Sequence, residues 1–227
     1  MPSAYQLKIT LLGFRPPIWR RVLIASDVTF YALHSLIQDA FPYADCHLSG
    51  FRQSHLKGRQ AYLVQDPAVT AQWSVPDEAT LKRMPKWLRE QQDKHFDVYT
   101  TELAELLNEE HPRIQYTYDY SDNWDHDIVL EKIIKTNELI LPAIPGGKRQ
   151  APPEDSRGYI DESPAIIKAS RTRQGAEWRR LLREWGKQDL DAILEECQEF
   201  LEEPFDPSQI EITDPAERLA EWRQWQG

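Results

Sequence analysis

One stretch decides the fold, Tyr116-Thr117-Tyr118-Asp119-Tyr120-Ser121-Asp122-Asn123-Trp124-Asp125-His126-Asp127-Ile128-Val129-Leu130-Glu131. Apolar and polar residues alternate on both sides of an Asp-rich centre, which is the pattern of a β-hairpin. Strands normally exclude aspartate, so these aspartates indicate either a turn rich in backbone contacts or a special site. Successive side chains of a strand point to opposite faces, so two sets of residues each share a face. They are Tyr116, Tyr118 and Tyr120 in the first strand, and Trp124, His126, Ile128 and Leu130 in the second.

The length of the hairpin loop decides what faces Asp119. A two-residue loop at 122–123 places Asp119 opposite His126 and orients the imidazole, as a general base or a metal ligand requires. A three-residue loop at 121–123 places it opposite Asp125, and two close carboxylates raise one pKa or attract a cation. Both registers stay open at this point. The favoured interpretation is structural: the aspartates fix the turn through hydrogen bonds to nearby backbone groups.

Two side chains of the hairpin have an expected environment in either register. Trp124 begins the second strand beside a ladder of tyrosines that can stack on it, so we expect it to be largely buried. We expect His126 to be hydrogen-bonded to an aspartate. Both expectations concern the hairpin as a structural unit and hold for any function.

The first forty residues predict two strands and a helix. Apolar residues alternate over 5–11 and again over 19–24, and the prolines at 16–17 end the first strand because they cannot donate ladder hydrogen bonds. Asp27 or Thr29 can cap a helix that runs to about Ala40, where Pro42 stops it. This helix has one apolar face and is expected to pack across a sheet.

The remaining segments predict an α+β protein with a mostly antiparallel sheet and a packed helix, followed by a C-terminal helical segment. Short strands are expected over 46–53 and 61–64, with a turn at Lys57-Gly58, and a short helix over 101–107. Residues 66–95 look like an irregular excursion, and 141–157 like a Pro/Gly-rich loop. Helical apolar stripes follow. We therefore expect an α+β core over 1–165 and a helical segment over 166–227 packed on it.

Composition narrows the class of protein. The chain has 227 residues, a net charge of −10 and two cysteines, Cys46 and Cys197, which cannot form a disulfide framework. No apolar run approaches the ~20 residues of a membrane span. A reduced, cytoplasmic protein without a membrane partner is expected. The acidic charge disfavours nucleic acid, and Arg15, Arg20 and Arg21 around Trp19 are expected to pair with acidic residues of the chain.

Several motifs together resemble the plasmid pRiA4b ORF-3-like family. They follow the family's order over nearly the whole chain. Members often carry cysteines beside a Pro-Pro-Glu-Asp motif, where this chain has Gln150 and Ser156. The resemblance implies a plasmid-associated family without an established activity. The matching pieces are Tyr5-Gln6-Leu7-Lys8-Ile9, Pro16-Pro17-Ile18-Trp19-Arg20-Arg21, Leu33-His34, residues 41–51, residues 116–131, Pro152-Pro153-Glu154-Asp155 and Phe205-Asp206-Pro207.

The hairpin and the Pro-Pro-Glu-Asp motif supply the candidate binding residues. Two prolines fix the backbone that carries the motif's carboxylates, which is a low-entropy way to hold ligands, although a helix N-cap at Asp155 is the favoured interpretation. If the two segments meet, they form an acidic cleft suited to a divalent metal bound by oxygens and one imidazole. The candidate cleft comprises Asp119, Asp122, Trp124, Asp125, His126, Glu154 and Asp155. Cys46 is interpreted as a buried strand residue, and His47 as a minor candidate ligand.

Two functions from different classes remain. The first is a cytosolic binding or interaction module with a protein or small-molecule partner, because the aromatic and acidic surface comes without a complete catalytic motif such as a phosphate loop or a nucleophile elbow. The alternative is a metal-dependent hydrolase or nuclease that uses the acidic cleft, where a metal lowers the pKa of bound water.

Overall fold

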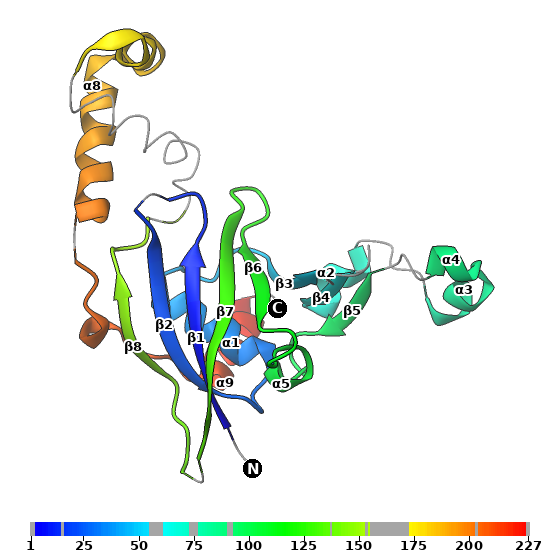
Figure 1. Cartoon of the computed structure of the whole chain (residues 1–227). Helices are drawn as coiled ribbons and strands as arrows, with labels where there is room; N and C mark the ends of the chain where they lie inside the picture. Colours follow the sequence, from blue (N-terminus) through cyan, green and yellow to red (C-terminus); the bar gives the residue numbers. More distant parts are fainter. Residues whose placement is uncertain are drawn as a thin grey trace.

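A mostly antiparallel sheet dominates the structure, a computed structural model that describes residues 3–14, 16–54, 61–72, 77–89, 93–136, 138–152, 154, 173–202 and 204–225 (Figure 1). Its eight strands lie in the order β5-β4-β3-β6-β7-β1-β2-β8, and only the β4–β5 pair is parallel. The strands are β1 (Ser3–Leu11), β2 (Ile18–Ala25), β3 (Ser49–Ser54), β4 (Ala61–Gln65), β5 (Lys94–Asp97), β6 (Arg113–Tyr118), β7 (Trp124–Lys135) and β8 (Ala143–Lys148).

Helix α1 (Phe30–Ala40) packs across one face of the sheet, as the sequence predicts (Figure 1). Of the two predicted caps the structure uses Thr29, whose side chain accepts a hydrogen bond from the backbone N–H of Ala32. Apolar residues of α1 are buried against the inner faces of β1, β2, β6 and β7 in one continuous core. The α+β class with a packed helix is therefore confirmed.

The hairpin loop is longer than either predicted register allows. β6 pairs with β7 so that Tyr116 faces His126 and Tyr118 faces Trp124, which leaves residues 119–123 as the loop. Asp119 and Asn123 adopt positive φ values of 55° and 53°, and the N–H of Asn123 donates to the Asp119 carbonyl at 2.6 Å. Asp119 therefore fixes the turn, as the favoured structural interpretation predicts, and it faces neither His126 nor Asp125.

The predicted faces of the hairpin strands are confirmed, except at Tyr120. Tyr116 and Tyr118 are fully buried, and the residues that alternate along the core face of β7 are buried as well. Tyr120 lies in the loop and bends back over β3, where its hydroxyl accepts a hydrogen bond from Gln65 at 2.8 Å. Gly50 makes this approach possible, because a Cβ there would lie 2.5 Å from the Tyr120 hydroxyl.

Two segments predicted as irregular contain regular elements. Residues 141–157 include the edge strand β8, where Pro145 is tolerated because an edge strand leaves one row of N–H groups unpaired. Residues 66–95 include the start of β5 and three short helices, α2 (Pro67–Gln72), α3 (Glu78–Arg83) and α4 (Lys86–Arg89). Between β5 and β6 lies a further short helix, α5 (Leu103–Leu106). The predicted turn at Lys57-Gly58 lies outside the described residues.

The C-terminal part is helical, and among its described residues Phe205, Ile210, Ile212 and Leu219 pack against the core. Its elements are α8 (Gly175–Glu202), the 3-10 turn η1 (Pro207–Gln209) and α9 (Pro215–Trp225), and Gly186 breaks α8 with a φ of 74°. Arg218 of α9 forms an ion pair with Asp39 of α1. The division near residue 165 lies outside the described residues and stays a prediction. Among the helices described, none combines the length and apolarity that crossing a membrane requires.

Replacing Trp124 by alanine should cost about 3–5 kcal/mol of unfolding free energy, the range for large aromatic residues in cores. Trp124 has no exposed surface. Urea denaturation followed by circular dichroism measures the loss. Trp19→Ala is the matched control: Trp19 is only partly buried and contacts Lys8 and Arg21 through its ring, so about 1 kcal/mol is expected there. Equal losses in the two variants would contradict the assigned burial.

Candidate functional site

Cys46 and His47 lie in the segment between α1 and β3, and not in a strand as predicted. β3 begins only at Ser49, so the thiol of Cys46 is exposed and the prediction of a buried strand residue is wrong. The backbone N–H of Cys46 donates to the Tyr118 hydroxyl at 3.0 Å. Side chains of the hairpin thus hold this segment and place its thiol and imidazole beside β6.

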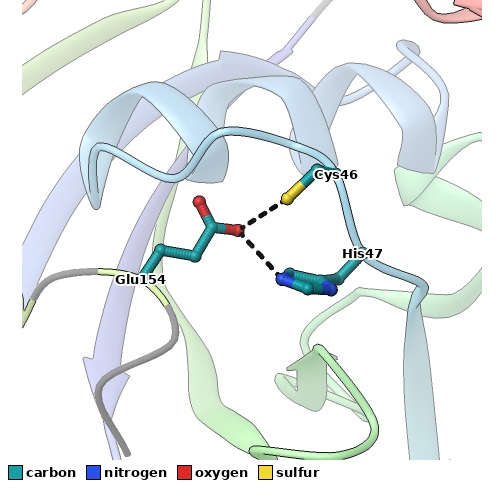
Figure 2. Close-up of side chains that lie close together, drawn as sticks. All are labelled: Cys46, His47 and Glu154. Carbon is teal, nitrogen blue, oxygen red and sulfur yellow. Dashed lines mark hydrogen bonds and ion pairs between the residues drawn. The ribbon is translucent and has the colours of Figure 1, made fainter.

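Glu154 reaches the same place from the far end of the chain. Its Oε2 accepts the backbone N–H of Ala44 at 2.6 Å, and its Oε1 accepts the Tyr118 hydroxyl in a short hydrogen bond. Oε1 also lies 3.5 Å from Sγ of Cys46 and 3.7 Å from Nε2 of His47 (Figure 2). The Pro-Pro-Glu-Asp motif and the hairpin therefore do meet, through Glu154 and Tyr118.

Electrostatics favours a neutral phenol at this contact. Burial, and then the hydrogen bond to Glu154, raise the pKa of Tyr118, so its hydroxyl keeps its proton and donates. Burial alone would raise the pKa of Asp119, but hydrogen bonds from the side chain and backbone of Ser121 outweigh it and lower the pKa. Asp119 is thus an anion, and its Oδ2 lies 3.8 Å from Nε2 of His47.

The predicted cleft residues are only partly brought together. Asp119 and Glu154 approach the same imidazole, that of His47, which the sequence ranked as a minor candidate. Asp125 points to the opposite face of β7 from the buried residues and accepts a hydrogen bond from Thr117 at 2.6 Å. Asp122 is partly buried in the hairpin loop, Trp124 lies in the core, and Asp155 lies outside the described residues.

His126 has a tyrosine as its hydrogen-bond partner where an aspartate was expected. Its Nε2 lies 3.2 Å from the hydroxyl of Tyr43, and its ring packs edge-on against Phe41 with centroids 4.7 Å apart. The alternation that buries Trp124 also directs His126 into the core. Tyr43 stacks on Tyr118, with centroids 4.8 Å apart. Tyr43 was not singled out from the sequence, because it is one aromatic residue in a segment without periodicity, although it lies within residues 41–51 that carry the family resemblance.

A pocket of about 140 Å³ opens next to Cys46 and His47. An engineered apolar cavity of about 150 Å³ holds benzene, so the pocket has room for a molecule of that size or for the end of a longer one. Its walls combine aromatic, acidic and apolar side chains from α1, residues 45–49, residues 66–69, residues 98–99 and α9. They are Tyr31, His34, Asp45, Cys46, His47, Leu48, Ser49, Asp66, Val69, Val98, Tyr99 and Trp222.

Hydrogen bonds fix the polar walls of this pocket. His34 bonds to Asp45 through Nε2 at 2.9 Å and to Tyr116 through Nδ1 at 2.8 Å. The Tyr99 hydroxyl donates to Asp66 at 2.6 Å, and burial followed by that bond raises the pKa of Tyr99. Burial, with the charge of Asp45, raises the pKa of Tyr31 to about 12. Both phenols therefore stay neutral at physiological pH.

Arg20 is buried and binds backbone carbonyls, where the sequence predicted acidic partners. It has no exposed area, and its guanidinium donates to the carbonyls of Ala40 at 2.7 Å and Arg149 at 2.8 Å. Burial lowers its pKa to about 9, so it remains a cation at neutral pH. Of the predicted acidic pairings, that of Arg21 is found, with Glu131 at 2.6 Å, and Arg15 lies outside the described residues.

Replacing His126 by alanine should cost about 1–3 kcal/mol of stability, because the hydroxyl of Tyr43 then loses a buried partner. Chemical denaturation measures the change. His111→Ala is the control, since His111 lies outside the core and a surface change is expected to stay within about 0.5 kcal/mol. Native stability in His126→Ala together with lost ligand or metal binding would instead assign His126 to function.

Comparison with known proteins gives consistent results. Residues 3–214 match the family described as plasmid pRiA4b ORF-3-like protein. Uncharacterized protein y4hQ of Sinorhizobium fredii is 24% identical over 157 residues, which are 69% of this chain and 68% of that protein. The crystal structure of MM3350, a protein of unknown function from Methanosarcina mazei Go1, superimposes with a TM-score of 0.60 at 24% identity, covering 93% of this chain and 99% of that one. The chain belongs to the plasmid pRiA4b ORF-3-like family.

Proposed function

We propose that the protein is a cytosolic binding module whose pocket beside α9 takes a small molecule, or the end of a peptide, that carries an amine. The observation that supports this most is the pairing of aromatic walls with carboxylates around a space of about 140 Å³. Binding sites commonly combine apolar walls with a few fixed polar groups. A reduced thiol at Cys46 fits a reducing compartment such as the cytosol.

The charges of the pocket support an amine as the ligand group. Asp45 and Asp66 line the pocket, and the described lining includes neither lysine nor arginine. Asp45 is already shared by His34 at 2.9 Å and Arg218 at 3.8 Å. Asp66 accepts hydrogen bonds from two neutral groups, the Tyr99 hydroxyl and the Ala68 N–H, both at 2.6 Å, so its charge is the one we assign to the ligand. The rings of Tyr31 and Tyr99, with centroids 5.2 Å apart, offer the faces on which a cation is stabilised.

A metal-dependent hydrolase or nuclease is the second candidate. One observation favours it, the approach of Cys46, His47 and Glu154. Of these three ligands, Glu154 is the one that belongs to the acidic cleft predicted from the sequence.

Three fragments with one ring and different charges test the proposal: benzylamine, benzyl alcohol and benzoate. Ligand-observed NMR titration should show saturable binding of benzylamine, weaker binding of the alcohol and none of benzoate. Asp66→Asn should weaken benzylamine binding roughly tenfold or more, because a hydrogen bond to a charged group is worth about 1.5–3 kcal/mol.

Asp127→Asn is the matched control. It removes the same charge from a partly buried carboxylate that pairs with Arg113 at 3.2 Å, away from the pocket, and benzylamine binding should stay unchanged. The proposal fails if benzoate binds as well as benzylamine, if no fragment saturates, or if both substitutions weaken binding equally.

A further inference from the structure

The structure brings a thiol, an imidazole and a carboxylate together outside the residues assigned to the amine ligand. Ligand atoms of Cys46, His47 and Glu154 all lie within 4.8 Å of one another (Figure 2). Two come from adjacent residues and the third from more than a hundred residues later. We propose that these three side chains bind a divalent ion of the zinc class.

Two of the three distances between the ligand atoms fit a tetrahedral ion. With bonds of about 2.0–2.3 Å, neighbouring ligands of tetrahedral zinc lie about 3.3–3.8 Å apart. Oε1 of Glu154 is 3.5 Å from the sulfur of Cys46 and 3.7 Å from Nε2 of His47. The ligand atoms of Cys46 and His47 lie within 4.8 Å of each other, so these two side chains must approach each other by up to about 1 Å to bind one ion.

The chemistry of the ligand set selects the kind of ion. Thiolate and imidazole prefer zinc and similar transition metals, whereas magnesium and calcium prefer sites made only of oxygens. The thiol of Cys46 and the imidazole of His47 therefore favour an ion of the zinc class over the oxygen-bound ion expected from the sequence. Three protein ligands leave one position of a four-coordinate ion for water or another donor, the composition of catalytic rather than structural zinc sites.

A second set of groups holds Glu154 in a ligating orientation. The Ala44 N–H binds Oε2 at 2.6 Å, which directs Oε1 toward the thiol and the imidazole. The hydroxyl of Tyr118 donates to Oε1, and Tyr118 is itself fully buried. Metal sites depend on such supporting hydrogen bonds, whose loss weakens metal affinity roughly 10–100-fold. The carboxylate of Asp119, 3.8 Å from the same imidazole nitrogen, adds negative charge beside a cation.

This proposal goes beyond the binding function and stands without it. Cys46 and His47 also line the pocket, so the ion would occupy one wall of it. The amine assigned to Asp66 has no part in the coordination. The protein can therefore bind the fragment without binding a metal, or bind a metal without binding the fragment, so the two proposals fail separately.

The test is titration of the reduced, full-length protein with Co²⁺, followed by competition with Zn²⁺. Visible and near-ultraviolet spectra should show d–d bands of a four-coordinate ion and a thiolate-to-cobalt charge-transfer band that saturate at one equivalent. Zn²⁺ should abolish both. Cys46→Ser should remove the charge-transfer band. Tyr118→Phe should keep the band but weaken Co²⁺ affinity roughly 10–100-fold, and Glu154→Gln should weaken it further.

Two controls and a folding check complete the design. Cys197→Ser removes the second thiol of the chain, in α8, and should leave the spectrum unchanged. Glu131→Gln removes a carboxylate that binds Arg21 elsewhere on the sheet and should leave Co²⁺ affinity unchanged. Circular dichroism confirms that each variant is folded, which is expected for Cys46→Ser because Cys46 is exposed.

Some results would overturn the proposal. Absence of a saturable cobalt spectrum means that the three groups form a hydrogen-bonded ion pair only. A charge-transfer band that survives Cys46→Ser, or disappears in Cys197→Ser, assigns the metal to another thiol.

Discussion

A buried guanidinium holds together the segments from which the candidate site is built. Arg20 projects from the core face of β2 and lies between the rings of Phe41, 4.9 Å from its centroid, and Phe205, 3.7 Å away. Its N–H groups bind the last carbonyl of α1, at Ala40, and the carbonyl of Arg149 after β8. A buried cation is costly unless its donors find partners, and Nε and Nη1 of Arg20 find theirs at these carbonyls, so both carbonyls must stay where they are.

The fixed ends of these segments explain how distant residues meet. Ala40 precedes the segment that carries Cys46 and His47, and Arg149 precedes the segment that carries Glu154. The side chain of Arg20 therefore fixes the start of both segments. Gly147 supports the arrangement, because a Cβ there would lie 2.6 Å from the ring of Phe205. Arg20, Phe41 and Phe205, which come from three motifs that carry the family resemblance, therefore lie together.

Local patterns predicted the elements, and long-range contacts decided the site. Alternation placed Trp124 and His126 on the buried face of β7, and capping placed α1, because both depend on neighbouring residues alone. The loop 119–123 was missed because contacts across the sheet set its length, including the bond from the N–H of Asp119 to the Leu48 carbonyl at 2.9 Å. Cys46 was wrongly assigned to a strand, because the hydroxyl of Tyr118 and not a neighbouring strand binds its backbone N–H. Strand β8 was missed because its proline and glycines are residues typical of loops.

We propose that Glu154, Cys46 and His47, separated in the sequence and joined by the fold, form one coordination sphere. X-ray absorption at the zinc edge of the metal-loaded protein measures this coordination directly. We expect a four-coordinate ion with one sulfur at about 2.3 Å and nitrogen or oxygen ligands at about 2.0–2.2 Å. A shell without sulfur, or six oxygen ligands, would contradict it.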